Sequence, residues 1–150
     1  MSTKLICVNM VDMEGLEDSP LGYLLYRVAA ALRSEVVATA LEPLELTFSQ
    51  YLCLRLLSQL PGKSNAQLAR EATVSPQAMN KVIRELQERG LVTRPATVSA
   101  GRSLPATLTR EGTALLAQLD PLVLAAESHV LAKLSAGERR EFRRLLAAVG

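Results

Sequence analysis

The chain of 150 residues carries a formal net charge of +2, is 3% aromatic and contains no tryptophan. This length fits one domain over residues 1–150, and the abundance of leucine and alanine favours a mainly α fold, α+β in class, over an all-β fold. No apolar run approaches the roughly 18 residues of a membrane-spanning helix, so we expect a soluble protein with no membrane partner.

Residues 1–19 are predicted to form an N-terminal tail. A short apolar run around Cys7 follows Lys4, as in a signal peptide, but four acidic residues follow where a cleavage site would lie, at positions 12, 14, 17 and 18. We therefore expect no export. The segment is compatible with a flexible tail, an alternative translation start, or a strand added at a dimer interface.

Residues 20–46 are expected to contain a long helix with a wide apolar stripe. Its apolar side chains recur at helical spacing, and a stripe of this width at the start of a small protein needs a covering surface. The residues of this stripe are Leu21, Leu24, Leu25, Val28, Leu32 and Val36. We assign this segment to dimerisation.

A second helix is predicted at about 48–59. Cys53 lies among leucines in this segment, which favours a buried thiol. Two cysteines without metal-ligand spacing indicate a reducing compartment, and the cytoplasm is the simplest location. A redox-sensing regulator that acts through Cys7 or Cys53 stays an alternative, because it depends on a lowered thiol pKa that a sequence does not reveal.

Residues 64–92 have the pattern of two short helices joined by a tight turn. The first helix is expected at 64–72, the turn at 73–75 and the second helix at 76–89. Ser75 is a good N-cap, Pro76 suits the first helical position, and Gly90 suits the C-terminal end. This order predicts a helix-turn-helix whose second helix reads DNA.

The second helix of this pair has one apolar face and one polar face. Amide side chains match the hydrogen-bonding edge of adenine, and lysine and arginine match guanine or phosphate. The face predicted to enter the major groove consists of Gln77, Ala78, Asn80, Lys81 and Arg84.

Two strand-like segments, 91–94 and 106–109, flank a loop of small residues at 95–103. They predict a β-hairpin, which we call the wing. Arg102 lies near its tip, and a narrow minor groove attracts an arginine. Pro105 confines the returning strand to an edge because proline lacks the backbone donor.

The charges are unevenly distributed along the chain. Residues 47–110 contain nine lysines and arginines against three glutamates, a net charge of +6, which leaves −4 for the remainder. A basic middle segment between acidic ends is expected when one module meets phosphates.

Residues 111–150 predict further helices. Pro121 should kink or break the first of them after Asp120, because proline removes a donor and clashes with the preceding turn. Ser135 and Glu138 resemble a capping box, so the last helix is expected to be separate. The uncovered apolar faces at both ends of the chain favour a homodimer over packing within one chain.

The order of these elements resembles the MarR family of bacterial winged helix-turn-helix regulators over roughly residues 20–149. The most specific stretches are 86–94, which runs from the end of the recognition helix into the wing, and 108–112, which leaves the wing. The wing departs from the family pattern, since Ala100 and Gly101 stand where members commonly carry an aspartate and a basic residue. The resemblance implies N- and C-terminal dimerisation helices at 20–46 and 111–150 around a DNA-binding module at 47–110.

The sequence therefore predicts a regulator, a repressor acting as a homodimer on a pseudo-palindromic double-stranded operator. Arg102 would enter the minor groove. Phosphate contacts are expected from Gln50, Ser64, Asn65, Ser75 and Arg94.

The resemblance also implies a small phenolic or lipophilic effector. Such an effector would release the operator by favouring the conformation that does not bind DNA. The candidate pocket residues are Tyr23, Tyr26, Arg27, Phe48 and Tyr51.

Two functions of other classes compete with this interpretation. A winged-helix module could bind a protein and never read DNA. Catalysis is disfavoured, because the single histidine, His129, lies in an apolar helical segment and no nucleophile has an evident base. We expect no cofactor and no metal.

Overall fold

A computed structural model describes residues 15–16, 18–95 and 105–150. The predicted tail, with Cys7, lies almost wholly outside these residues, and Arg102 lies outside them as well. The elements, in chain order, are α1 (Leu21–Val36), the π-helical turn η1 (Val37–Leu41), the 3-10 turn η2 (Glu42–Leu44), α2 (Phe48–Gln59), α3 (Asn65–Glu71), α4 (Pro76–Glu88), β1 (Val92–Thr93), β2 (Thr107–Leu108), α5 (Arg110–Val130) and α6 (Ala136–Val149). The mainly α expectation is confirmed. In this part of the chain, no helix is both long and apolar enough to cross a bilayer.

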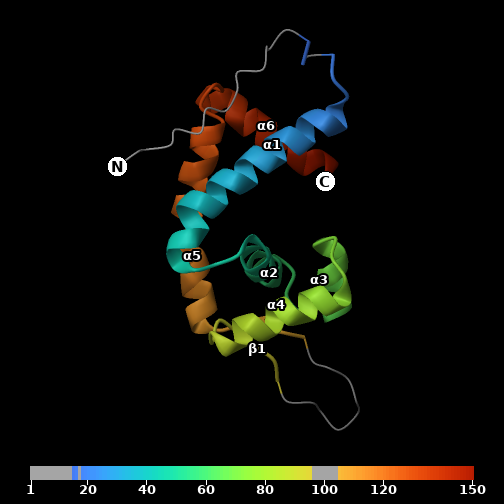
Figure 1. The fold of residues 1–150 in the computed structure, drawn as a ribbon, viewed down its shortest axis with the longest axis vertical. Coiled ribbons are helices and arrows are strands. Elements are labelled where there is room, and N and C mark those ends of the chain that lie inside the picture. The colour runs from blue at the N-terminus through green and yellow to red at the C-terminus, as the bar shows by residue number, and fades with distance from the viewer. Residues whose placement is uncertain (1–14, 17, 96–104) are drawn as a thin grey trace, which may run out of the picture.

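The helices form two connected regions (Figure 1). The long helix α5 runs along one side of the molecule and packs against α1 at one end. At the other end, α2, α3 and α4 pack together beside the two short strands. The strands are antiparallel, with Val92 opposite Leu108, as the predicted hairpin requires.

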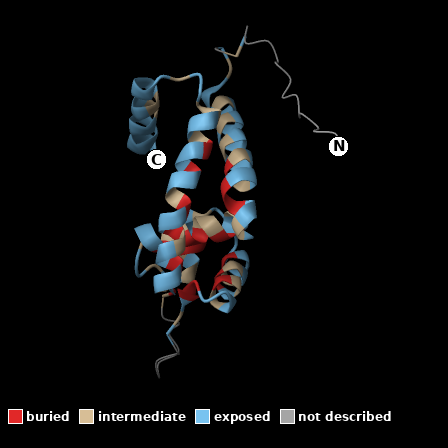
Figure 2. Ribbon diagram, turned by 90° about the vertical axis from the view of Figure 1, so that its left-hand side faces the viewer, coloured by how far each residue is buried: buried red, intermediate tan, exposed pale blue. Residues whose placement is uncertain are grey.

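Two apolar clusters hold these regions together. One surrounds Cys53, Ile83 and Leu86 and joins α2, α3, α4 and the sheet to the start of α5. The other surrounds Leu41 and Leu119 and joins α1, η1 and α5. Figure 2 shows the buried residues concentrated along these contacts and nearly absent from the outer faces. Since α5 contributes to both clusters, it connects the two regions.

The helix-turn-helix is capped at both ends of each helix. The hydroxyls of Ser64 and Ser75 accept hydrogen bonds from the backbone N–H of the third residue of α3 and of α4. After α4, Gly90 adopts a φ of +71°, and Leu91 N donates to Leu86 O at 2.9 Å. This is a Schellman ending, in which a left-handed glycine terminates the helix. The predicted limits of the recognition helix are confirmed.

Pro121 does not break the helix that contains it. The sequence predicted a kink or break after Asp120, but α5 continues from Arg110 to Val130 through this residue. Leu119 and Val123 on either side of the proline are buried in the second cluster. This packing stabilises the helical path and outweighs the missing hydrogen bond, so the expected break is wrong.

The terminal helices leave apolar side chains uncovered. No residue of α6 is buried, and Figure 2 shows no red on this C-terminal helix. Val149 is 91% exposed. On α1, Leu21 and Tyr26 are each 71% exposed. The capping box predicted at Ser135 and Glu138 is present, so α6 is a separate helix.

Candidate nucleic-acid interface and adjoining cavity

The polar face of α4 is open to solvent. Met79, Ile83 and Leu86 are buried against α2 and α3, which leaves the opposite face of α4 outward. The outward side chains include Gln77, Ala78, Lys81 and Arg84, all of which are exposed. The predicted base-reading residues therefore lie together on one helix face, at the spacing that a major groove accepts.

Asn80 and Arg94 contact each other. Arg94 Nη1, at the end of β1, donates to Asn80 Oδ1 at 3.3 Å, and Arg94 Nε is buried without a partner. The pair ties the base of the wing to α4. An unsatisfied buried donor is costly, so this nitrogen is an exception among the buried polar atoms of the fold.

Three of the predicted phosphate contacts cluster where α3 and α4 begin. Ser64 and Ser75 are exposed, each at a helix N-terminus. Asn65 differs from the expectation, because its Nδ2 donates to Pro76 O at 3.1 Å and its Oδ1 is buried. Its side chain joins α3 to α4, so we withdraw it as a phosphate contact.

The prediction that Gln50 contacts phosphates is also corrected. Its side chain is 8% exposed and bonded within the fold, to the backbone of Thr47 and to Glu85. It therefore does not face phosphates. The sequence suggested an exposed polar residue at the start of α2 but carried no sign of the partner on α4.

The base of the wing is held against the start of α5. Thr109 Oγ1 donates to Gly90 O at 2.7 Å and accepts from Gly112 N at 3.0 Å. One threonine thus caps α5 and binds the glycine that ends α4. The loop 96–104, which contains Arg102, lies outside the described residues. The minor-groove contact of Arg102 therefore stays a prediction.

A cavity of about 260 Å³ lies between α1, α2 and α5. Its walls are mostly apolar, with one cation and one anion among them. They consist of Ala29, Leu32, Arg33, Val36, Phe48, Tyr51, Val123 and Glu127. The guanidinium carbon of Arg33 lies 4.7 Å from the ring centroid of Phe48. Apolar walls with a few polar groups are typical of small-molecule sites.

The structure places only two of the five predicted pocket residues in this cavity. Phe48 and Tyr51 line this cavity, but Tyr23, Tyr26 and Arg27 do not. These three lie nearer the start of α1 and are exposed, with the Arg27 guanidinium 6.0 Å from the Tyr23 ring. The sequence analysis missed Arg33, although it shares a helical face with Leu32 and Val36 at the appropriate spacing.

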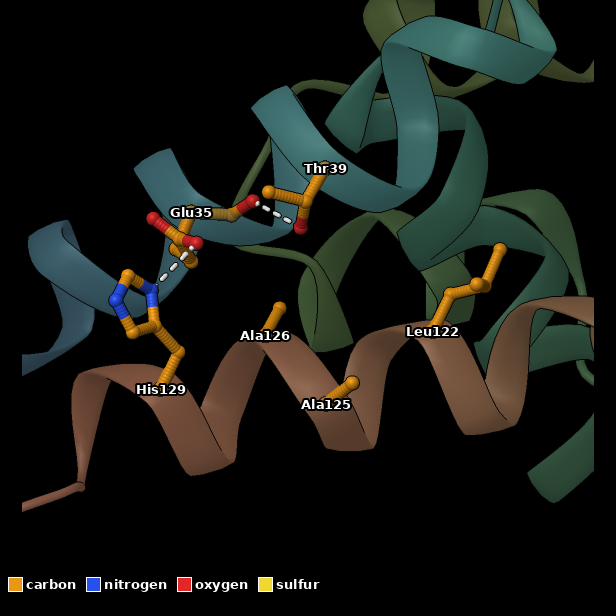
Figure 3. Close-up of a pocket in the computed structure, with 6 residues that line it drawn as sticks. All are labelled: Glu35, Thr39, Leu122, Ala125, Ala126 and His129. Atoms are coloured by element: carbon orange, nitrogen blue, oxygen red, sulfur yellow. Dashed lines mark hydrogen bonds and ion pairs between the residues drawn. The ribbon is translucent and has the colours of Figure 1, made fainter.

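A second hollow lies between α1 and α5 (Figure 3). Ala125 and Ala126 form its floor, and Glu35 Oε1 lies 2.8 Å from His129 Nδ1 across it. The side chain of His129 is 75% exposed. An exposed pair of this kind contributes little to stability, so we assign His129 to the helix surface.

Cys53 does not have the properties of a redox sensor. It is 0% exposed, and burial raises the pKa of its thiol to about 12. A reactive cysteine needs the opposite shift and access to solvent, so the redox alternative through Cys53 is wrong. Among the described residues, no three histidine, cysteine or acidic side chains gather as metal ligands.

Comparison with known proteins gives consistent matches. A model of the MarR family matches residues 46–104. The chain is 58% identical over 134 residues to the HTH-type transcriptional repressor Rv2887 of Mycobacterium tuberculosis, which covers 89% of this chain and 96% of that protein.

Two solved structures of a Mycobacterium tuberculosis MarR family protein, Rv2887, are similar along the whole fold. The complex with salicylic acid has a TM-score of 0.76 at 58% identity and covers 90% of this chain and 99% of that chain. The complex with DNA has a TM-score of 0.76 at 54% identity and covers 89% of this chain and 99% of that chain.

Proposed function

Because the chain belongs to the MarR family, we propose that it represses transcription by placing α4 in the major groove of a double-stranded operator. As a member of this family it is a DNA-binding transcriptional regulator and not an enzyme. The observation that carries the proposal is the outward face of α4, where Gln77, Lys81 and Arg84 are exposed together. A capped, rigid helix with this face is suited to base reading.

The proposed contacts follow the geometry of the site. Gln77, Ala78, Asn80, Lys81 and Arg84 read bases, while Ser64, Ser75 and Arg94 bind phosphates. Arg102 of the wing enters the minor groove. These residues belong to a DNA-binding module at 47–110, and the segments 20–46 and 111–150 form the dimerisation region.

A homodimer is supported by the uncovered apolar faces. Leu21 and Tyr26 on α1 and Val149 on α6 are exposed in the single chain, and large exposed apolar patches mark interaction sites. A two-fold dimer presents two copies of α4 to successive major grooves and so favours a pseudo-palindromic operator. A repressor of this kind acts where the chromosome lies, in the cytoplasm of a bacterium.

The cavity between α1, α2 and α5 is the proposed effector site. A relative of this chain binds salicylic acid, an aromatic carboxylate. Phe48 and Tyr51 offer apolar surface to an aromatic ring, and Arg33 offers a guanidinium to a carboxylate. Glu127 accepts from Arg143 Nη2 at 2.5 Å through Oε2, which leaves Oε1 to accept a hydrogen bond from a phenolic hydroxyl. The site therefore favours a phenolic monoanion.

Fluorescence anisotropy with the full chain tests the proposal. The probe is DNA from upstream of its own gene, compared with scrambled DNA over a salt series. We expect a preference of about 10³ or more for the operator and a steep salt dependence. Salicylate should then weaken the binding. Equal, weak binding to both DNAs would instead favour the protein-interaction module.

A further inference from the structure

Gln50 is the one buried polar or charged side chain in the part of the chain that the structure describes. Both the oxygen and the nitrogen of its side-chain amide make hydrogen bonds. Oε1 accepts from Thr47 N at 3.1 Å, and Nε2 donates to Glu85 Oε2 at 3.0 Å. Only this orientation of the amide satisfies both partners, because a backbone N–H needs an acceptor and a carboxylate needs a donor.

The carboxylate of Glu85 has a different neighbour on each oxygen. Oε2 binds Gln50 on the buried side of α4, and Oε1 lies 3.9 Å from Lys81 Nζ on the exposed side. The side chain of Lys81 is 73% exposed, whereas that of Glu85 is 37% exposed. The position of a base-reading lysine is thus linked to a buried amide on another helix.

The same turn of α2 forms a wall of the effector cavity. Phe48 and Tyr51, two residues before and one residue after Gln50, line that cavity, with their ring centroids 6.1 Å apart. One helical turn therefore presents aromatic side chains to the cavity and an amide to α4. A close-packed interior transmits a displacement of such a turn to its neighbours.

We propose that the Gln50–Glu85 hydrogen bond couples the effector cavity to DNA reading, with Glu85 as a positioning residue for Lys81. This inference rests on the proposed function and assigns its regulation to particular side chains. A ligand against Phe48 and Tyr51 displaces the first turn of α2 and with it Gln50. Glu85 then loses its donor, and both carboxylate oxygens, not Oε1 alone, are free to turn toward Lys81 and the DNA phosphates.

The sign of the effect follows from the charges. While Gln50 holds Glu85, one carboxylate oxygen is bound toward α2 and only the other faces Lys81. Once released, the carboxylate repels phosphates and competes with them for Lys81, which weakens DNA binding. A ligand that favours the released arrangement shifts the population away from the DNA-binding state.

Gln50→Glu isolates this contact. A glutamate at this position still accepts from Thr47 N, as in an ordinary capping box, but it cannot donate to Glu85 when ionised. The quantity measured is the factor by which saturating salicylate raises the Kd for the operator. Site-to-site coupling commonly amounts to about 5–150-fold, and we expect the variant to reduce the wild-type factor to about twofold or less.

Two further variants control the experiment. Gln118→Glu makes the same chemical change at an exposed site on α5 and should keep the wild-type factor. The double variant Gln50→Glu, Glu85→Gln reverses donor and acceptor and has the wild-type net charge. It restores the hydrogen bond, so we expect it to recover the stability lost in Gln50→Glu, whereas the coupling should stay low because a neutral side chain at position 85 cannot repel phosphates or compete for Lys81. A general loss of folding would not be repaired in this way.

The pH dependence gives an independent readout. In Gln50→Glu the two carboxylates lie close together, and at low pH one of them keeps a proton and donates it to the other. The coupling of this variant should therefore increase at acidic pH, relative to the wild type. The wild-type amide does not titrate, so its coupling should not follow this curve.

The outcomes separate this coupling from the function on which it rests. If the wild type does not bind its operator, or binds salicylate without any change in DNA affinity, the proposed function fails and the coupling fails with it. If the wild type responds and Gln50→Glu responds by the same factor, only the role of the Gln50–Glu85 contact is refuted. Calorimetry on each variant verifies that salicylate still binds.

Discussion

A Cβ atom on Gly112 would lie 2.1 Å from the carbonyl oxygen of Leu91, far inside the contact distance of carbon and oxygen. Gly112 lies in the first turn of α5, and Leu91 follows the glycine that ends α4. The same carbonyl oxygen accepts a hydrogen bond from Thr109 N at 3.1 Å. The close approach therefore fixes the recognition helix, the base of the wing and α5 relative to one another.

Gly112→Ala should destabilise the protein. The added methyl meets backbone, which cannot rotate away, so Leu91 and its hydrogen bond must shift. We expect a loss of about 1–3 kcal/mol in the free energy of unfolding, measured by urea denaturation. Gly22→Ala is the matched control, since a Cβ atom at this helical glycine meets nothing within 4 Å. An unchanged stability for Gly112→Ala would refute the close approach.

Lys81→Ala and Arg84→Ala should weaken binding to the operator. Each removes an exposed cation from the outward face of α4. If the side chain makes a bidentate contact with a base, the cost is about 1–3 kcal/mol on the operator and smaller on scrambled DNA. Anisotropy titrations of both DNAs measure the difference. Arg140→Ala, an exposed cation on α6, is the control. Equal losses on both DNAs would leave phosphate contact as the only role.

Arg33→Ala should weaken the binding of salicylate. The proposed guanidinium–carboxylate bond is of a type worth about 1.5–3 kcal/mol, so the Kd measured by calorimetry should rise about 10- to 150-fold. Arg27→Ala makes the same change two turns earlier on α1, outside the cavity, and should leave the Kd unchanged. If Arg27→Ala raised the Kd and Arg33→Ala did not, the ligand would lie beside Tyr23 and Tyr26 and not in the cavity.

Cys53 should resist alkylation in the folded protein. Burial raises the pKa of its thiol to about 12, so at pH 8 the side chain stays in the unreactive thiol form. The measurement is the rate of iodoacetamide labelling in a Cys7→Ser background, with and without urea. We expect labelling only on unfolding. Labelling of the native protein at the rate of a free thiol would show that Cys53 is accessible.

The recognition helix could be predicted from the sequence because its limits depend on nearby residues. The Ser75 hydroxyl accepts from an N–H three residues away, and Gly90 ends the helix through bonds to the turn before it. The amphipathic pattern then distinguishes the buried face from the outward face. Each of these interactions is completed within one or two turns of chain.

The remaining features depend on contacts between distant segments. Pro121 by itself predicts an interruption, but packing of Leu119 and Val123 keeps α5 continuous. Gln50 by itself suggests an exposed polar side chain, but Glu85, 35 residues along the chain, makes it a buried one. A sequence lists both partners without indicating that they meet.

The sequence by itself determined the order of the elements, the ends of the helix-turn-helix and the outward chemistry of α4. The tertiary structure decided which arginine of α1 lines the cavity, which polar residues lie inside and how closely α5 approaches Leu91. The physical reason is the range of the interactions. Capping and helical periodicity act over a few residues, whereas burial depends on which surfaces pack together after the whole chain has folded.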